Sequence, residues 1–148
     1  MSEFQVVVCQ LGEESYGLDI GSVFEIIRFQ ECTAVPASPS FVDGIINLRG
    51  RIIPVVDMAS RFGLRRSEAT KSTRIIVAGT AGMRVGLVVD AVTEVLMIPE
   101  ESVEPTPDVA SGYDSAYIRG IAKLAEELVI LLDLGALFAD QIPTGLAA

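Results

Sequence analysis

Side chains that could carry out acid–base or covalent chemistry are scarce in this sequence. The chain contains no histidine and two cysteines, Cys9 and Cys32. Without histidine, Ser-His-Asp and Cys-His catalytic arrangements are impossible, and the commonest zinc ligand is missing. The cysteines lack CxxC spacing, so we interpret them as small buried side chains in a reducing compartment, with a disulfide left open. We expect neither catalysis nor a metal site.

The carboxylates with the most suggestive positions have structural explanations. Asp57, Asp90 and Asp133 each follow an apolar run, where helix capping or turn formation accounts for an aspartate. Asp57 and Asp133 are interpreted as structural residues that start short helices, over 57–62 and 134–138. No EF-hand, P-loop, GxGxxG or metal-cluster spacing occurs in the sequence. No cofactor is therefore expected.

An arginine in a turn is more informative than these acids. The segment Asn47-Leu48-Arg49-Gly50-Arg51 joins two apolar runs, which predicts a tight hairpin with Gly50 at positive φ. A turn needs glycine or asparagine but has no use for a guanidinium. Because arginine binds carboxylates bidentately and packs its stem on apolar surface, Arg49 is a candidate interface residue. The alternative is a solvated turn arginine.

Composition limits the classes of partner. The chain has 148 residues and a net charge of −9, from 20 acidic and 11 basic side chains. The nearest approach to a basic cluster is Arg65, Arg66 and Lys71 beside Glu68, so nucleic acid is not an expected partner. Half of the residues are apolar, but no uncharged apolar window reaches the ~18 residues of a spanning helix. The start does not resemble a signal peptide, so a cytoplasmic protein without membrane insertion is expected.

The elements that would position these residues occur twice. Residues 4–26 align without a gap onto residues 73–95, and a later stretch aligns Gly44 and Asp57 with Gly120 and Asp133. The aligned glycines Gly17 and Gly86 lie inside strand patterns, which indicates close backbone approach and a structural role. The repeat predicts a mainly β fold of two pseudo-symmetric five-stranded barrels with short helices, one of them near the C-terminus. Chance similarity between β-rich segments is the alternative.

The two repeats are predicted to fold as one unit. The first barrel is expected at about 4–66 and the second at about 70–138, within a single domain over 1–148. Strands can be exchanged between the subdomains. A barrel of ~65 residues alone has a marginal core, so the halves are expected to pack against each other. The aligned glutamates Glu25 and Glu94 follow the second strand of each half, where either solvation or partner contact explains them.

Four spaced motifs resemble the CheW-like domain family, and the resemblance covers about residues 4–138. The longest is Pro39 to Asp57, PSFVDGIINLRGRIIPVVD. The others are Tyr16-Gly17-Leu18-Asp19-Ile20 with Val23 and Glu25-Ile26, Arg84-Val85-Gly86-Leu87-Val88-Val89-Asp90, and Gly120-Ile121 followed by Leu128 to Asp133. The resemblance departs from the family at Met58-Ala59, where Leu-Arg is common, and in the loop 29–37. These departures affect partner specificity.

The resemblance implies a fold, a function and a set of site residues. It implies SH3-like barrels in a non-catalytic adaptor that links methyl-accepting chemoreceptors to the histidine kinase CheA at membrane-associated receptor arrays. The kinase is bound through its regulatory domain, and each receptor through its cytoplasmic tip. The partner-binding positions carried over are Val23, Glu25, Gly44, Arg49 and Val95. Alternatives are an adaptor for another chemosensory kinase pathway (motility or development), a structural array component, or a small enzyme or ligand-binding barrel.

Overall fold

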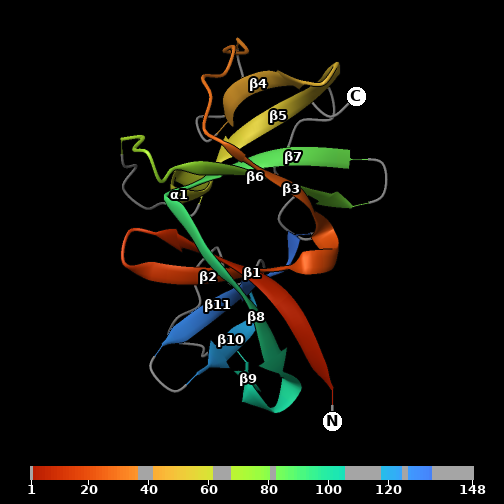
Figure 1. The fold of residues 1–148 in the computed structure, drawn as a ribbon, viewed down its shortest axis with the longest axis vertical. Helices are drawn as coiled ribbons and strands as arrows, with labels where there is room; N and C mark the ends of the chain where they lie inside the picture. Colours follow the sequence, from red (N-terminus) through yellow and green to blue (C-terminus); the bar gives the residue numbers. More distant parts are fainter. Residues whose placement is uncertain are drawn as a thin grey trace.

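The fold was determined as a computed structural model of residues 1–148, which describes residues 2–36, 42–61, 68–80, 83–105, 118–124 and 127–134. The described residues form eleven strands and one short α-helix, shown in Figure 1. The strands are β1 (Glu3–Leu11), β2 (Glu14–Asp19), β3 (Val23–Arg28), β4 (Val42–Leu48), β5 (Arg51–Asp57), β6 (Arg74–Thr80), β7 (Met83–Val89), β8 (Ala91–Pro99), β9 (Val103–Glu104), β10 (Ile118–Lys123) and β11 (Leu128–Leu132). The helix is α1 (Met58–Arg61), and 3-10 turns cover Ile20–Ser22 and Glu100–Ser102.

The strands pair into two sheets that lie one above the other in Figure 1. The first sheet has the order β8-β1-β2-β11-β10-β9, and the second has the order β3-β6-β7-β5-β4. Each sheet contains one parallel pair, β2 with β11 and β5 with β7, and its other pairs are antiparallel. The fold is therefore mainly β, as the sequence predicted.

The two sheets are built alike. When the sequence repeats are aligned, β3, β6, β7, β5 and β4 correspond in order to β8, β1, β2, β11 and β10. The registers agree as well: Gly17 lies opposite Leu131 in the parallel pair of the first sheet, and Gly86 lies opposite Val55 in that of the second. These four residues are related by the same sequence offsets as the repeats. The repeat therefore describes backbone pairing as well as sequence.

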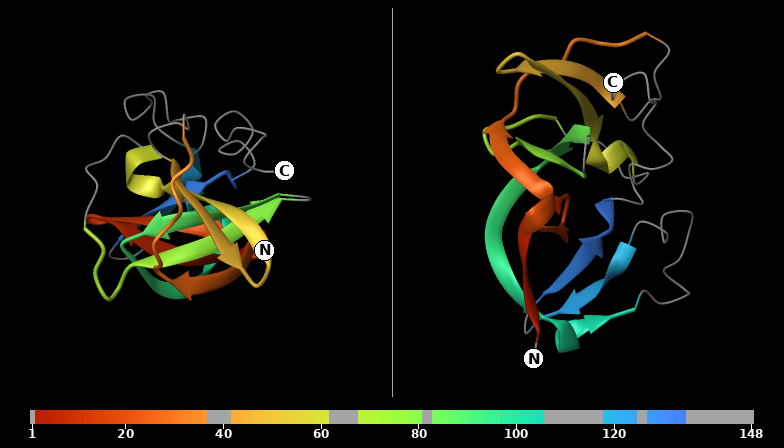
Figure 2. Two further views of the ribbon diagram at one scale, coloured as in Figure 1. Left: turned by 90° about the horizontal axis from the view of Figure 1, so that it is seen from above. Right: turned by 90° about the vertical axis from the view of Figure 1, so that its right-hand side faces the viewer.

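Each sheet takes strands from both halves of the sequence. The N-terminal hairpin β1–β2 pairs with β8 and β11 of the second half, while β6 and β7 pair with β3 and β5 of the first. In the right-hand view of Figure 2 the colours of the two halves are accordingly mixed within each layer. The exchange is reciprocal. Each repeat contributes its first two strands, β1–β2 or β6–β7, to the sheet that holds the remaining strands of the other repeat.

The expectation of closed SH3-like barrels is wrong for the described residues, which form two open sheets. In the second sheet the edge strands β3 and β4 do not pair; Thr33, beyond β3, instead forms an isolated bridge with Ile45. In the first sheet the edges are β8, of nine residues, and β9, of two. Closing a barrel requires edge strands that can form a continuous ladder, and neither sheet has a matched pair.

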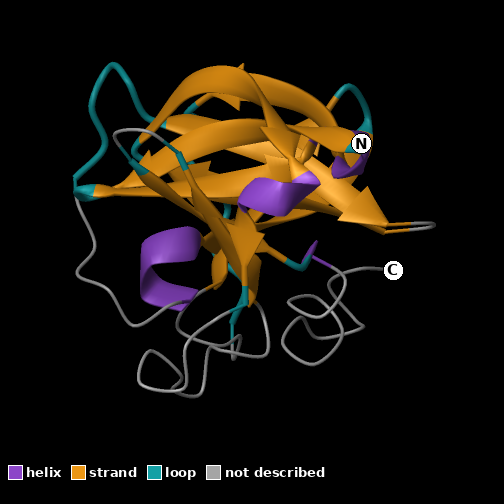
Figure 3. Cartoon of the chain, turned by 90° about the horizontal axis from the view of Figure 1, so that it is seen from below, coloured by secondary structure: helices purple, strands orange, loops and turns teal. Residues whose placement is uncertain are grey.

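Among the described residues, helical structure is limited to short segments beside the sheets (Figure 3). The helix expected over 57–62 is α1, which begins at Met58 and follows Asp57 directly. The Asp57 carboxylate is 4% exposed and its Oδ1 accepts a hydrogen bond of 3.2 Å from the Ser60 amide, the geometry of a helix N-cap. Of the helix expected over 134–138, only Leu134 lies within the described residues, so that prediction falls outside them.

Three apolar clusters hold the sheets together. The largest lies between the sheets and includes Val7, Leu18, Ile76 and Leu87. Because successive strand residues point to opposite faces, the neighbours of these residues fill a second cluster on the outer side of each sheet. Val6, Val8 and Leu131 are in the outer cluster of the first sheet, and Ile75, Val77 and Val55 are in that of the second. The inner strands are buried on both faces, which explains their uninterrupted apolar sequences.

The two aligned glycines lie against side chains of the strands that pair with their own. A Cβ atom at Gly17 would be 2.9 Å from Leu131 Cδ2, and one at Gly86 would be 2.8 Å from Ile75 Cγ2. A side chain at either position would therefore force its neighbours to move. No helix within the described ranges is long and apolar enough to span a membrane.

Candidate protein-interaction surface

The β4–β5 hairpin has a two-residue turn made of Arg49 and Gly50. Leu48 pairs with Arg51, and the two turn residues have φ angles of 52° and 85°. Positive φ at both central positions is the type I′ geometry that matches the twist of a hairpin. The turn is braced by a 2.9 Å hydrogen bond that the Gly50 amide donates to Asn47 Oδ1. The predicted hairpin and the positive φ of Gly50 are both present.

Arg49 has a backbone conformation that is unfavourable for most residues with a side chain. It has the only positive φ of any non-glycine residue in the described part of the chain. A side chain in this region costs roughly 1–2 kcal/mol, and asparagine or glycine is preferred at the first position of a type I′ turn. The turn would therefore form more easily without arginine, so the reason for the arginine lies in what its side chain does.

The Arg49 side chain binds Glu25 on β3. Arg49 Nη1 lies 2.9 Å from Glu25 Oε1 and 2.6 Å from Oε2, and the side chains are 71% and 28% exposed. Since β3 and β4 are opposite edges of the second sheet, the pair connects the two edges that backbone pairing leaves open. The hydrogen bond from Arg49 lowers the pKa of Glu25 and raises that of Arg49, so both groups stay charged.

Apolar side chains are exposed on the same strands. Phe24 is 48% exposed, Ile26 39% and Ile52 54%. The Arg84 guanidinium lies 4.1 Å from the centre of the Phe24 ring, a cation–π contact, and its charge also lowers the pKa of Glu25. We use the name hairpin surface for the half-buried Glu25, the exposed Arg49 and the exposed apolar side chains Phe24, Ile26 and Ile52 of these strands. Since side chains alternate along a strand, Ile26 lies on the opposite face of β3 from Glu25.

The other predicted partner-binding residues lie in different environments. Val23, two residues before Glu25 on β3, is partly buried against the cluster between the sheets. Gly44 is buried with a φ of 145°, and a Cβ there would collide with the Thr33 carbonyl. Val95 is 50% exposed on β8, an edge strand of the other sheet. The structure thus joins Glu25 and Arg49 directly, buries Gly44, and places Val95 on a separate surface.

Sequence reasoning missed Phe24, Ile52 and Arg84. The signal was present in β3, whose sequence Val-Phe-Glu-Ile-Ile-Arg carries apolar residues on both faces of an edge strand. An edge strand lacks a neighbouring strand on one side, so its side chains are less covered and apolar ones are exposed unless a partner covers them. Asp133, predicted as structural, lies directly after β11 and is exposed.

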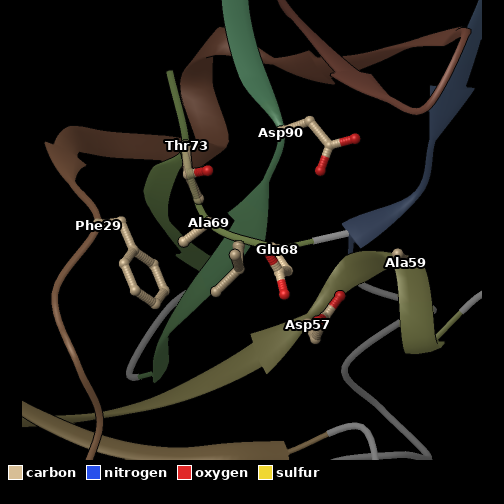
Figure 4. A pocket seen from close by; sticks show the side chains of 8 residues that line it. Phe29, Asp57, Ala59, Glu68, Ala69, Thr73 and Asp90 are labelled. Carbon is tan, nitrogen blue, oxygen red and sulfur yellow. The ribbon is translucent and has the colours of Figure 1, made fainter. Parts of the chain in front are cut away.

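Reactive chemistry has no visible basis in the described residues. Burial raises the pKa of the Cys9 thiol to about 12, which disfavours the thiolate nucleophile. A cavity of about 370 Å³ near α1 is lined by Asp57, Glu68 and Asp90 together with Phe29 (Figure 4). Asp90 Oδ2 accepts a 2.7 Å hydrogen bond from the Gly12 amide, as Asp57 does from Ser60. Within the described ranges no group of three metal-binding side chains is found.

A charged pair at a strained turn, with exposed apolar side chains on the same strands, is typical of a protein-interaction surface. Residues 5–141 match the CheW-like domain family. The chain is 36% identical over 140 residues to the chemotaxis protein CheW of Thermotoga maritima, covering 95% of this chain and 91% of that protein. It is 35% identical over 136 residues to a probable chemotaxis protein CheW of Rhizobium etli, covering 92% and 88%.

A solved structure agrees with these sequence relatives. The scaffolding protein TtCheW from Thermoanaerobacter tengcongensis superposes with a TM-score of 0.85 at 44% identity, over 93% of this chain and 89% of that one. The chain therefore belongs to the CheW family of chemotaxis scaffold proteins.

Proposed function

We propose that this chain is a non-catalytic adaptor that links the cytoplasmic tips of methyl-accepting chemoreceptors to the histidine kinase CheA. It would bind the regulatory domain of the kinase and act in the cytoplasm, at membrane-associated receptor arrays. Membership of the CheW family supports this function, since the relatives are named as chemotaxis and scaffolding proteins.

The conformation of Arg49 carries the proposal. An arginine stands where the type I′ turn favours asparagine or glycine, and its side chain is 71% exposed beside the Glu25 carboxylate. Such a group can exchange its intramolecular carboxylate for one on a partner while its stem packs on exposed apolar side chains. We assign receptor contact to the hairpin surface, with Val23 and Gly44 acting through the shape of β3 and β4.

A second surface would serve the kinase. Val95 and Met97 on the edge strand β8 are 50% and 51% exposed, and they belong to the other sheet. Separate surfaces let one chain hold two partners at once, which raises their effective concentration without new chemistry. Transmission of the receptor signal then requires a coupling free energy of about 1–3 kcal/mol between the two surfaces.

The test is a reconstituted kinase assay with Arg49→Glu. This charge reversal sets two carboxylates against each other, so we expect receptor control of the kinase to be lost while the circular dichroism spectrum is unchanged. Lys123→Glu, an equal charge reversal at an exposed position at the end of β10, is the matched control and should activate normally. Normal activation by Arg49→Glu would contradict the assignment.

Co-purification identifies the partners. The full-length chain is expected to retain CheA and a receptor fragment from a lysate of its own source. Retention of a different histidine kinase would favour the alternative adaptor role in motility or development. Array assembly without kinase activation would favour a purely structural component.

A further inference from the structure

A second cavity carries the opposite charge from the one near α1. It has a volume of about 470 Å³ and lies between the end of β3 and the segment that leads into β6. Its lining consists of Arg28, Phe29, Thr70, Lys71, Thr73 and Arg74, and we call it the basic cavity. Three cationic side chains converge there in a chain whose net charge is −9. This concentration of positive charge needs a physical reason.

The strand pairing itself opposes the arrangement. Arg28 on β3 and Arg74 on β6 are direct cross-strand partners, and like charges directly opposite each other are destabilising. Within the described residues neither Arg28 nor Lys71 forms an ion pair with a carboxylate. The repulsion is therefore not relieved by the described part of the chain, and an anion between these groups would relieve it.

The cavity wall is held in place before any ligand binds. Arg74 Nη1 donates hydrogen bonds of 2.7 Å to the Lys71 carbonyl and 2.9 Å to the Thr73 carbonyl. The turn that carries Lys71 is closed by a 2.8 Å bond from the Thr70 amide to Thr73 Oγ1, and Thr73 is 5% exposed. Arg74 and the turn are therefore prearranged, which reduces the ordering cost of binding an anion beside them, whereas the Arg28 and Lys71 side chains are exposed. The remaining N–H groups of Arg74 have no acceptor in the described ranges.

The neighbouring acidic cavity limits the size of the anion. The two cavities share Phe29 and Thr73, and the acidic one is lined by Asp57, Glu68 and Asp90 (Figure 4). An extended polyanion that crossed the basic cavity would meet these carboxylates and be repelled. A compact anion would remain on the side of Arg28, Lys71 and Arg74.

We propose that the basic cavity binds a small molecule bearing a phosphate group, with the Arg28 and Arg74 guanidiniums on the phosphate oxygens and Lys71 supplying further positive charge. Guanidinium groups suit phosphate because their planar donors form paired, charge-assisted hydrogen bonds. The Phe29 side chain lines the space beside the anion and offers an apolar contact to the rest of the molecule. The site is separate from the hairpin surface and does not depend on the adaptor function.

Calorimetric titration of the full-length chain with pyrophosphate and with AMP, at constant ionic strength, tests the site. The double variant Arg28→Gln/Lys71→Gln removes two exposed cations and leaves Arg74, whose guanidinium supports the backbone. We expect this variant to bind both probes at least about tenfold more weakly than the wild type. The matched control Arg51→Gln/Lys123→Gln removes one arginine and one lysine that are also exposed, in the two distal hairpins.

The outcomes are distinguishable. Wild-type affinity in the control variant, together with weaker binding by the cavity variant, would support the site. Tighter binding of AMP than of pyrophosphate would support the apolar contact with Phe29. Equal weakening in both variants would indicate a general charge effect and overturn the proposal. NMR spectra of the wild type with the same probes give a second readout. If millimolar pyrophosphate and AMP produced neither heat in the titration nor chemical-shift changes, the proposal would be overturned as well.

Discussion

The two sheets of this protein have the same framework and opposite chemistry at their distal hairpins. The β4–β5 hairpin carries Arg49 and Arg51, whereas the aligned β10–β11 connection reads Ala125-Glu126-Glu127. The apolar residues that follow are equivalent in both sequence and exposure, with Ile52 at 54% and Leu128 at 58%. Duplication has therefore preserved the features on which packing depends while the charge has reversed.

The surroundings of the hairpins extend the contrast. In the second sheet the cationic hairpin is bound to a carboxylate of its own sheet, through Arg49 and Glu25. In the first sheet Glu127 lies beside a cavity of about 530 Å³ that is also lined by Glu13 and Glu14, and Glu127 Oε2 accepts a 3.3 Å bond from Ser15 Oγ. The residue type at a buried position is constrained by the side chains packed around it. The residue type at a hairpin tip is constrained mainly by what the tip binds, so two otherwise equivalent sheets can recognise different partners.

The largest effect on stability is expected where the sheets are equivalent. Gly17→Ala and Gly86→Ala should each lower the free energy of unfolding by about 1–3 kcal/mol, because the new methyl group overpacks the layer against β11 or β6. Urea denaturation measures both values. Gly12→Asn is the control, since this turn position has a φ of 63° and no atom within 4 Å of an added Cβ. Destabilisation by only one of the two substitutions would break the equivalence.

A smaller effect on stability is expected at Arg49, where the requirements of the turn and the role of the side chain can be tested separately. Arg49→Asn relieves the disfavoured φ, so the free energy of unfolding should stay the same or rise by up to about 1 kcal/mol. Receptor control of the kinase should nevertheless be lost, because asparagine cannot reach Glu25 or a partner carboxylate. Urea denaturation and the reconstituted kinase assay give the two readouts. If the Arg49→Asn variant still coupled receptor to kinase, Arg49 would have no role beyond forming the turn.

The smallest expected effect is on the stability of the fold at acidic pH. Arg49 lowers the pKa of Glu25, so the pair stabilises the fold above the unfolded-state glutamate pKa of about 4.3. That stabilisation is lost as the pH falls through the lower pKa of the folded state, and solvent screening keeps it small. Glu25→Gln should therefore flatten the acid limb of a stability–pH curve measured by urea denaturation. Glu94→Gln removes the aligned carboxylate and is the control; an identical flattening there would argue against a specific Arg49 contact.

Local features of the candidate site could be predicted because they depend on adjacent residues. The Asn47–Arg51 turn, the positive φ of Gly50 and the short helix after Asp57 follow from turn chemistry and capping. The Glu25–Arg49 contact could not be derived from the residues alone, because the partners lie 24 positions apart and meet only when the sheet curves. The exposure of Phe24 and the burial of Gly44 were hidden for the same reason.

By itself the sequence determined the strand content, the internal repeat and the absence of histidine, which together predicted a mainly β framework without histidine-dependent catalysis. Only the tertiary structure decided that each repeat contributes its first two strands to the other repeat's sheet, and that the described strands form two open sheets. Strand partners at long sequence separation are chosen by the burial of whole faces, which no local pattern records. The charges that meet at the hairpin surface and in the basic cavity depend on that choice.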